Sequence, residues 1–497
     1  EFQDTNSIQY AWLRVLAGDA IPVVAVGDDD QSIYGWRGAK IENIQRFTHD
    51  FKDTQTVRLE QNYRSTKTIL DAANGVIGHN SGRLGKDLWT DGDEGEPIKL
   101  YAGFNEQDEA RFIVEQIQAW TDEGNTRRSS AILYRSNAQS RVIEEALIRV
   151  GLPYRIYGGQ RFYERLEIRN ALAYLRLMTG RGDDPALERV INTPTRGIGS
   201  KTIDELRSVA REHSISMWQA IELVQERGLL AARARSSVAG FAALINELDS
   251  ETLELPLEEM VEHIIHRTGL IDFHKAEKGE RGQARVENLE ELVSAAKTFR
   301  AEDETLSPVQ QFLDSAALDA GDSQADPYED SVQMMTLHSA KGLEFPLVIL
   351  AGLEENLFPH RMSVEEPGRL EEERRLAYVG ITRAQQKLLI TYAESRRLHG
   401  SETYNTPSRF VREIPADLIE EVRLHGGLTR PLVERLQQPI GSANDSGLRL
   451  GQRVLHPMFG EGMVLNIEGR GANARIEVNF AEGSKWLVLQ YANLQAL

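Results

Sequence analysis

The 497-residue sequence contains no cysteine and no apolar run approaching the roughly 20 residues that a membrane-spanning helix needs. The lack of cysteine excludes a disulfide framework, a thiolate metal site and a cysteine nucleophile. It fits a reducing compartment, so we expect a cytoplasmic protein with no membrane partner. Basic residues are also scarce, because 57 Lys and Arg against 76 Asp and Glu give a net charge of -19. If the ligand is a nucleic acid, its phosphates must therefore meet a local basic channel.

The usual start of a protein is missing too. The chain opens on Glu1-Phe2-Gln3-Asp4 without an initiator methionine, a signal peptide or a preceding strand, and we interpret it as a fragment. Its length predicts about three domains, because a single core does not grow so large.

Strand and helix patterns alternate in two parts of the chain, which predicts an α/β fold. Apolar runs predict strands at 23–26, 57–59, 98–101, 131–134, 332–336, 347–350 and 388–392, and helical periodicity predicts helices at 5–18, 41–51, 69–77, 106–120 and 139–150. Between about 158 and 330 helical patterns dominate. An all-helical insertion within one α/β domain explains this order, whereas three separate domains would leave half-sheets with too few strands.

The end of the chain has a different composition. Residues 423–447 are polar and broken by Gly and Pro, as in a flexible linker. Residues 448–497 contain short β-rich runs at 453–456, 462–467, 474–480 and 485–489, separated by glycine turns. A small β-barrel of about five strands fits this pattern.

The loop after the predicted strand at 23–26 combines acids, an amide, aromatics and glycines. Ligands of open α/β sheets bind at such carboxyl ends of strands. Gln31 could orient a phosphate or a water, and Tyr34 and Trp36 could each offer a flat face to a base. The alternative is a polar loop whose aromatic side chains pack on the domain.

Three more blocks carry candidate chemistry. Tyr63 offers a stacking face and Arg64 a planar fork for phosphate oxygens, although such a pair is also common in surface packing. The loop 336–345 holds His338 and Glu344 among small residues, Lys341 and hydroxyls, which is typical of an anion cradle. Arg383 follows a charged helix and could neutralise charge on a γ-phosphate.

The stretch Gly197-Ile198-Gly199-Ser200-Lys201-Thr202 resembles the end of a phosphate-binding P-loop, but Ser200 stands where the motif requires Gly. With Arg196 before it, this helix start could still hold a nucleic-acid backbone phosphate, and a plain turn is the alternative. No complete P-loop motif occurs anywhere in the sequence.

Together and in this order, the blocks at 1–4, 26–39, 61–66, 336–345 and 371–384 resemble the UvrD, PcrA and Rep family of superfamily 1A DNA helicases. The resemblance implies two RecA-like P-loop NTPase motor domains, the first one partial. It places the C-terminal part of the first motor domain at 1–60, the second at 61–157 and 331–422, the helical insertion at 158–330, the linker at 423–447 and a Tudor-like barrel at 448–497.

The resemblance also implies roles for single residues. Glu1 would be the general base for the attacking water, and the Mg²⁺-binding Asp would precede it, so no metal ligand is assigned in this chain. Gln31 would sense the γ-phosphate of ATP, Arg64 and Arg383 would clamp it, Tyr63 would stack on adenine and Glu344 would meet the ribose. The residues implied in DNA contact are Tyr34, Trp36, His338, Arg196, Gly197 and Gly199.

The function implied is an ATP-dependent 3′ to 5′ DNA helicase of DNA repair and replication, with ATP and Mg²⁺ as cofactors. The implied partners are single-stranded DNA, the duplex junction, RNA polymerase through the C-terminal barrel, DNA repair proteins and a second copy of the chain. Because the P-loop is absent, we expect this chain to be inactive alone. The rival interpretation is a non-enzymatic fragment that binds DNA or RNA polymerase.

Overall fold

The structure, a computed structural model, describes residues 1–497 apart from 19–20, 278, 304, 322–324, 327, 367, 399–400, 423–451, 457–458, 469–474, 481–482, 493 and 497. The predicted linker at 423–447 lies outside the described residues. Within the described part, helices are too short or too polar to span a bilayer.

A seven-stranded sheet with the strand order β3-β4-β2-β5-β6-β1-β9 forms the centre of the molecule. Its strands are β1 (Ile98–Gly103), β2 (Ser130–Tyr134), β3 (Tyr154–Ile156), β4 (Val332–Thr336), β5 (Phe345–Ala351), β6 (Ala384–Ala393) and β9 (Ile419–Glu421). Every pairing is parallel, for example Ile132 opposite Met334 and Leu100 opposite Ile390. The apolar runs predicted at 98–101, 131–134, 332–336, 347–350 and 388–392 are therefore strands, as expected for a sheet that is buried on both faces.

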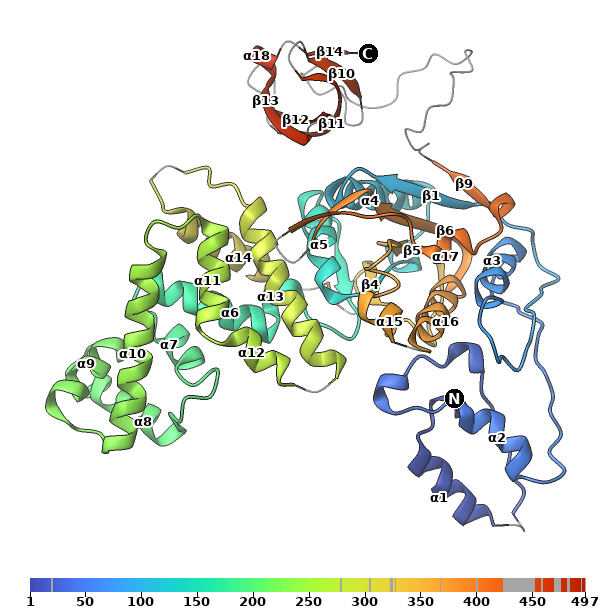
Figure 1. Cartoon of the computed structure of the whole chain (residues 1–497), viewed down its shortest axis with the longest axis horizontal. Coiled ribbons are helices and arrows are strands. Elements are labelled where there is room, and N and C mark those ends of the chain that lie inside the picture. Colours follow the sequence, from blue (N-terminus) through green and yellow to red (C-terminus); the bar gives the residue numbers. More distant parts are fainter. Residues whose placement is uncertain are drawn as a thin grey trace.

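Helices cover both faces of this sheet (Figure 1). Helices α3 (Lys67–Ile77) and α16 (Arg369–Ile381) pack on one face, and α4 (Glu106–Asp122) and α5 (Ser140–Arg149) pack on the other. Each helix buries a periodic apolar stripe, such as Ile113 and Ile117 in α4. Two short helices, α15 (Arg361–Glu365) and α17 (Arg409–Arg412), follow β5 and β8 (Ser401–Tyr404). Short 3-10 turns occur along the chain, namely η1 (Phe2–Asp4), η2 (Asp29–Gln31), η3 (Gly35–Arg37), η4 (Arg127–Ser129), η5 (Asn137–Gln139), η6 (Phe162–Glu164) and η7 (Ala416–Leu418).

Between β3 and β4 the chain forms a helical region with its own core, seen beside the sheet in green and yellow (Figure 1). Its helices are α6 (Leu166–Thr179), α7 (Asp184–Val190), α8 (Ser200–His213), α9 (Met217–Arg227), α10 (Ala232–Thr252), α11 (Leu257–Arg267), α12 (Leu270–Lys275), α13 (Glu280–Thr298) and α14 (Pro308–Gly321). The helical patterns predicted there are thus formed, while the exact domain bounds stay a prediction.

Residues 1–60 contain the predicted helices, α1 (Ser7–Ala17) and α2 (Glu42–Asp50), but neither predicted strand. The prediction of a buried strand at 23–26 was wrong, because Val24 is 90% exposed, and so was that at 57–59, where Leu59 is 80% exposed. A strand needs a hydrogen-bonded neighbour, and within the described residues 1–60 no neighbouring strand forms. Sequence pattern alone could not reveal that missing partner.

The last described residues form a five-stranded antiparallel sheet in the order β13-β12-β11-β10-β14. Its strands are β10 (Arg453–His456), β11 (Gly460–Glu468), β12 (Arg475–Phe480), β13 (Gly483–Val488) and β14 (Gln495–Ala496), with the short helix α18 (Leu489–Ala492) between the last two. Val454, Val464, Val478 and Phe480 contribute to a small core. The four predicted strands are present, and the Tudor-like barrel remains a prediction.

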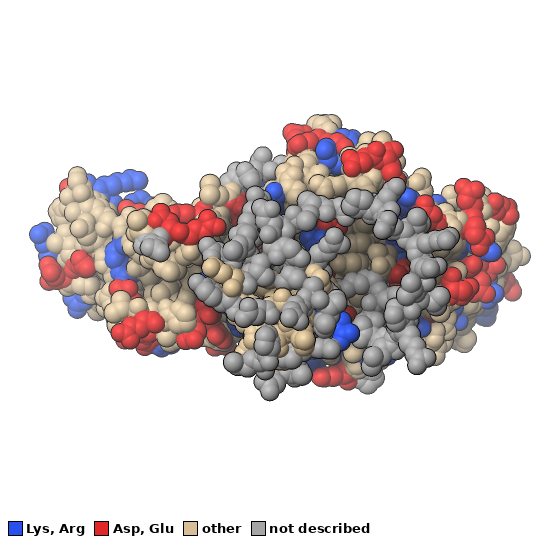
Figure 2. Space-filling view, turned by 90° about the horizontal axis from the view of Figure 1, so that it is seen from above, with Lys and Arg blue, Asp and Glu red and all other residues tan. Residues whose placement is uncertain are grey.

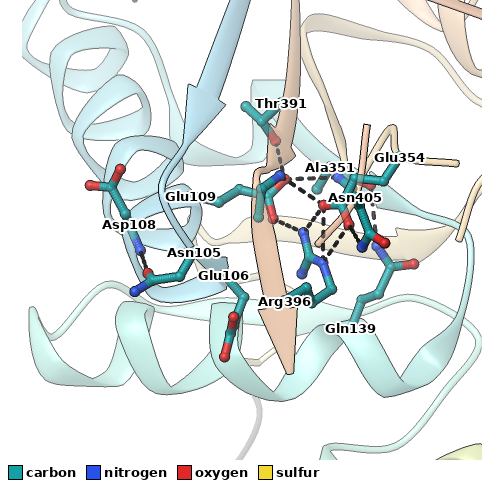
Figure 3. Close-up of polar contacts among 12 residues, drawn as sticks. Asn105, Glu106, Asp108, Glu109, Gln139, Ala351, Glu354, Thr391, Arg396 and Asn405 are labelled. Carbon is teal, nitrogen blue, oxygen red and sulfur yellow. Dashed lines mark hydrogen bonds and ion pairs between the residues drawn. The ribbon is translucent and has the colours of Figure 1, made fainter. Parts of the chain in front are cut away.

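A buried polar network joins the carboxyl ends of β1, β5 and β6 to the hairpin of β7 (Ser395–Leu398) and β8 (Ser401–Tyr404) (Figure 3). The guanidinium of Arg396 pairs with both Glu109 and Glu354. Glu109 accepts hydrogen bonds from Gly352 N at 2.8 Å and from Thr391 Oγ1 at 2.6 Å. The buried charges therefore fix backbone at the ends of two central strands.

Candidate functional site

The loop after β4 contacts the first residues of the chain through Lys341. Its Nζ donates to Asp4 Oδ2 at 2.7 Å and to Gln31 O at 2.9 Å, and it lies 3.3 Å from Glu1 Oε2. The side chain is only 6% exposed, which two carboxylates make tolerable. Burial alone would raise the pKa of Glu1, but the Lys341 ammonium outweighs it and holds the pKa below its usual value. Glu1 is therefore ionised at neutral pH.

Two arginines converge on the residues that follow Lys341. Arg64 Nε pairs with the Glu344 carboxylate, and Arg64 Nη1 donates to Thr382 O at 3.4 Å. Arg383 is buried, and it donates to Leu343 O at 3.0 Å and Val379 O at 3.0 Å. Burial, with Arg64 nearby, lowers the pKa of Arg383 to about 10, so Arg383 still carries a charge at neutral pH.

Gln31 lies next to Lys341, which donates a hydrogen bond to its backbone oxygen. Its side-chain Nε2 donates to Asp28 Oδ2 at 2.6 Å, within a row of three neighbouring carboxylates, Asp28–Asp30. The Asp28 charge also acts on Arg383, where it favours the protonated form. Gln31 and Arg383, which lie far apart in sequence, are thus brought into one electrostatic neighbourhood.

Tyr34, Trp36 and His338 form an aromatic cluster across the same boundary. Their ring centroids lie 6.4 to 6.5 Å apart, and Tyr34 Oη donates to His338 O at 3.2 Å. Burial, assisted by the charge of Arg135, lowers the pKa of His338 to about 3, so its ring is neutral at physiological pH. A small cavity beside Trp36 and His338 is lined also by Ser363, Arg369, Glu372 and Leu376.

Gly35 allows this cluster to approach α16. Its N–H donates to Glu372 Oε1 at 2.8 Å, and a Cβ at this position would lie 2.6 Å from Glu372 Oε2. The indole Nε1 of Trp36 is buried and has no hydrogen-bond partner among the described residues. The cluster therefore places three rings and a buried, unpaired donor beside a small cavity, a composition that suits contact with a nucleobase.

Tyr63 differs from the other aromatic candidates because its ring is 86% exposed. Its hydroxyl donates to Gln61 Oε1 at 2.8 Å, which orients the ring beside Arg64. An exposed, oriented ring next to a guanidinium fits the predicted stacking on adenine.

The remaining candidates lie in the helical region, away from this cluster. Arg196 donates to Val190 O at 3.1 Å and Thr268 O at 3.0 Å, so its guanidinium serves the local fold. Gly197 and Gly199 are exposed and precede α8. Contact of Arg196, Gly197 and Gly199 with DNA remains a prediction.

Sequence reasoning did not identify the contacts of three residues at this site. Lys341 was recognised only as part of an anion cradle, because its partners lie more than 300 positions away. Arg37 lies over the Trp36 ring, 4.5 Å from its centroid, and the adjacent Trp-Arg pair was a usable signal. Lys86 pairs with Asp28, and no local pattern indicated this contact.

Residues 1–52 match the model of the UvrD/REP helicase N-terminal domain, and residues 57–395 match that of the UvrD-like helicase C-terminal domain. DNA helicase II of Escherichia coli is 58% identical over 502 residues, covering 100% of this chain and 69% of that protein. DNA helicase II of Haemophilus influenzae is 54% identical with the same coverage. The ATP-dependent DNA helicase PcrA of Bacillus subtilis is 41% identical, covering 100% of this chain and 70% of that protein.

Proposed function

The chain belongs to the UvrD-like helicase family, and from that membership we propose that it provides the nucleotide-clamping and DNA-gripping parts of an ATP-dependent helicase. The helicase unwinds duplex DNA while moving 3′ to 5′ along one strand, in DNA repair and replication. Its cofactors are ATP and Mg²⁺.

One observation carries the proposal: residues 341–344 touch nearly all the proposed ATP-contacting groups. Lys341 holds Glu1 and the backbone of Gln31, Leu343 O accepts from Arg383, and Glu344 pairs with Arg64. Residues from the first 64 positions and Arg383 thus meet at one short loop. Such convergence is expected where two motor domains close on a nucleotide.

The residues divide the work as follows. Tyr63 stacks on the adenine and Glu344 meets the ribose, while Arg64 and Arg383 neutralise charge at the γ-phosphate. Glu1, already ionised, accepts the proton of the attacking water once Lys341 turns toward the phosphates. The triphosphate of ATP would supply the phosphoryl group and the negative charge that these side chains contact, and Mg²⁺ would neutralise part of that charge.

The aromatic cluster supplies the grip on DNA. Trp36 and Tyr34 lie in the proposed first motor domain, residues 1–60. His338 lies in the proposed second motor domain, residues 61–157 and 331–422. A base held between them feels any relative motion of the two domains. Closure and opening of the cleft therefore become steps along a single strand. Figure 2 shows acidic side chains mixed with basic ones on the face it displays.

The proposal is tested by DNA-stimulated ATP hydrolysis. This chain is compared with a longer version that carries a phosphate-binding loop ahead of Glu1, because the 497 residues contain no complete P-loop. We expect only the longer version to hydrolyse ATP and to unwind a duplex with a 3′ tail in preference to one with a 5′ tail. Absence of hydrolysis in the longer version, with DNA binding retained by this chain, would contradict the motor assignment.

That outcome would favour the second candidate, a non-enzymatic fragment that binds DNA or RNA polymerase. The specific observation behind it is that Glu1 and Asp4 are occupied by Lys341. The C-terminal five-stranded sheet is then the proposed contact for RNA polymerase, and pull-down with residues 448–497 deleted tests it. Duplex contact through the turn at Gly197 and Gly199, contact with repair proteins and self-association complete the proposed partners.

A further inference from the structure

Residues 79–88, here called the strap, run between the two proposed motor domains. The first of these comprises residues 1–60, called the first motor segment, and the second comprises residues 61–157 and 331–422, called the second motor segment. On one side the strap is tied to α3 and α16. The side-chain amide of Asn74 exchanges two hydrogen bonds with the backbone of Leu88, at 2.8 and 3.1 Å. Asn80 Nδ2 donates to Glu371 O at 3.0 Å, and Ser81 Oγ donates to the Glu371 carboxylate at 2.7 Å. The strap is therefore part of the second motor segment.

On its other side the strap meets the three carboxylates Asp28–Asp30 of the first segment. Each carboxylate has its own donor: Arg83 donates twice to Asp30, at 2.8 Å each, Leu84 N donates to Asp29 at 2.8 Å, and Lys86 pairs with Asp28. Asp30 is 1% exposed, so its charge depends on Arg83.

One oxygen connects the strap to the proposed γ-phosphate sensor. Asp28 Oδ2 accepts from Lys86 Nζ and also from Gln31 Nε2. A carboxylate held from one side by Lys86 cannot rotate freely, so the direction of the Gln31 amide depends on Lys86. The charges of Asp28 and Asp30 act on the buried Tyr378 of α16, and Arg383 and Tyr378 also interact electrostatically.

We propose that Lys86 and Arg83 are positioning residues for ATP hydrolysis, because they clamp Asp28–Asp30 and so fix Gln31 relative to Arg383. The inference rests on the proposed function for the role of Gln31. The inference adds a mechanical consequence. The loop of the first motor segment that carries Gln31 is aligned by the strap, which belongs to the second motor segment. Loss of the clamp lowers the rate of hydrolysis without removing any group that touches ATP.

The clamp itself is tested in this chain without nucleotide, by hydrogen–deuterium exchange of residues 28–38. The amides of Asp30, Gln31 and Ser32 are hydrogen-bonded within the loop. We expect Lys86→Met to speed their exchange about tenfold, and Lys86→Arg to restore it. Lys67→Met, which removes an exposed pair with Glu94, is the matched control and leaves this exchange unchanged. Equal exchange in Lys86→Met and the wild type would overturn the proposal.

Arg83 needs a paired variant because its removal alone leaves a buried charge. Arg83→Met with Asp30→Asn removes both charges, and we expect a folded protein with faster exchange at residues 28–32. Circular dichroism and the thermal midpoint check the fold. A folded double variant with wild-type exchange would also overturn the clamp.

Kinetics of the longer, P-loop-containing version separate this inference from the proposed function. We expect Lys86→Met to lower kcat about tenfold with the KM for ATP within about twofold, and Gln31→Ala to lower kcat at least as much. If Gln31→Ala has no effect, the proposed role of Gln31 fails. If Gln31→Ala lowers kcat but Lys86→Met does not, the positioning proposal fails while the proposed function stands.

Discussion

At the scale of single residues, the two arginines of the proposed clamp are held in different ways. The side chain of Arg64 is 30% exposed and pairs with Glu344, which is 46% exposed. An ion pair in contact with water contributes little free energy, so Arg64 can exchange Glu344 for a phosphate at small cost. Arg383 is buried among backbone carbonyls and is fixed before any ligand arrives. One arginine is therefore mobile and the other preorganised.

Arg64→Ala in the longer version should reduce ATP hydrolysis by about a thousandfold, because an arginine that neutralises transition-state charge contributes that much or more. Its thermal midpoint should stay close to the wild-type value, since only a partly exposed ion pair and one long hydrogen bond to Thr382 O are lost. Binding of single-stranded DNA, measured by fluorescence anisotropy, should change less than about twofold because the aromatic cluster is intact. A reduction in hydrolysis below about tenfold would contradict the clamp.

His338 gives the stability a pH dependence of known sign. Its pKa is about 3 in the folded chain and near 6.5 when unfolded, so below pH 6.5 only the unfolded state takes up this proton. Stability is therefore lost as the pH falls. Between pH 6.5 and about 5, the wild type should lose up to about 2 kcal/mol more than His338→Asn. Urea unfolding across this range measures the difference, and parallel curves for the two proteins would contradict it.

At the scale of elements, the sheet is held at its functional edge by charges as well as by apolar packing. Arg396 in β7 joins Glu109 in α4 to Glu354 beyond β5 (Figure 3). The loop that follows Glu354 leads to His360 and to Ser363 at the cavity beside Trp36. The network thus lies at the start of the segment that reaches this cavity.

Arg396→Met should destabilise the chain by about 3–5 kcal/mol, because it leaves two buried carboxylates without a counter-ion. Arg397→Met is the matched control, since neighbouring side chains in a strand point to opposite faces, and it should cost less than about 1 kcal/mol. Denaturant midpoints measure both. Equal effects of the two substitutions would show that the network does not hold the strand ends.

Elements with a regular pattern and a local cause were predictable. The parallel strands from 98 to 134 and from 332 to 393, their covering helices and the helical region between them follow from apolar periodicity. The strand β3 was missed because Tyr154–Ile156 is too short to show a period. At Val23 and Val57 the composition was that of a strand, but no neighbouring strand lies alongside among the described residues.

The candidate site was predictable as a set of blocks, but its contacts were not. Lys341 with Asp4 and Arg64 with Glu344 join residues 337 and 280 positions apart. No sequence period records such pairs. The contacts of Arg196 were equally hidden, because its guanidinium binds the carbonyl oxygens of Val190 and of Thr268, 72 positions away. Its predicted contact with DNA stays a prediction.

At the scale of the whole molecule, the helical region and the sheet have separate apolar cores. Polar contacts of α13 help to join them. Glu287 accepts from Ser136 Oγ at 2.6 Å and lies 3.2 Å from His360 Nε2, and Glu291 accepts from Arg141 at 2.7 Å. Burial opposes the charge of Glu287, but His360 and Ser136 outweigh it and lower its pKa to about 2. Glu287 therefore stays ionised down to strongly acidic pH.

Because separate cores joined by polar contacts unfold with limited cooperativity, loss of Glu287 should uncouple the two parts. In Glu287→Ala, Ser136 and His360 lose a buried acceptor, at a cost of about 1–3 kcal/mol. We expect calorimetry to show the unfolding endotherm broadened or split, and exchange of amides in α13 to rise relative to those in β5. Glu262→Ala, an exposed position in α11, is the control and should leave the endotherm unchanged. A single sharp transition in Glu287→Ala, shifted no more than in the control, would mean that the helical region and the sheet are joined by contacts other than this carboxylate.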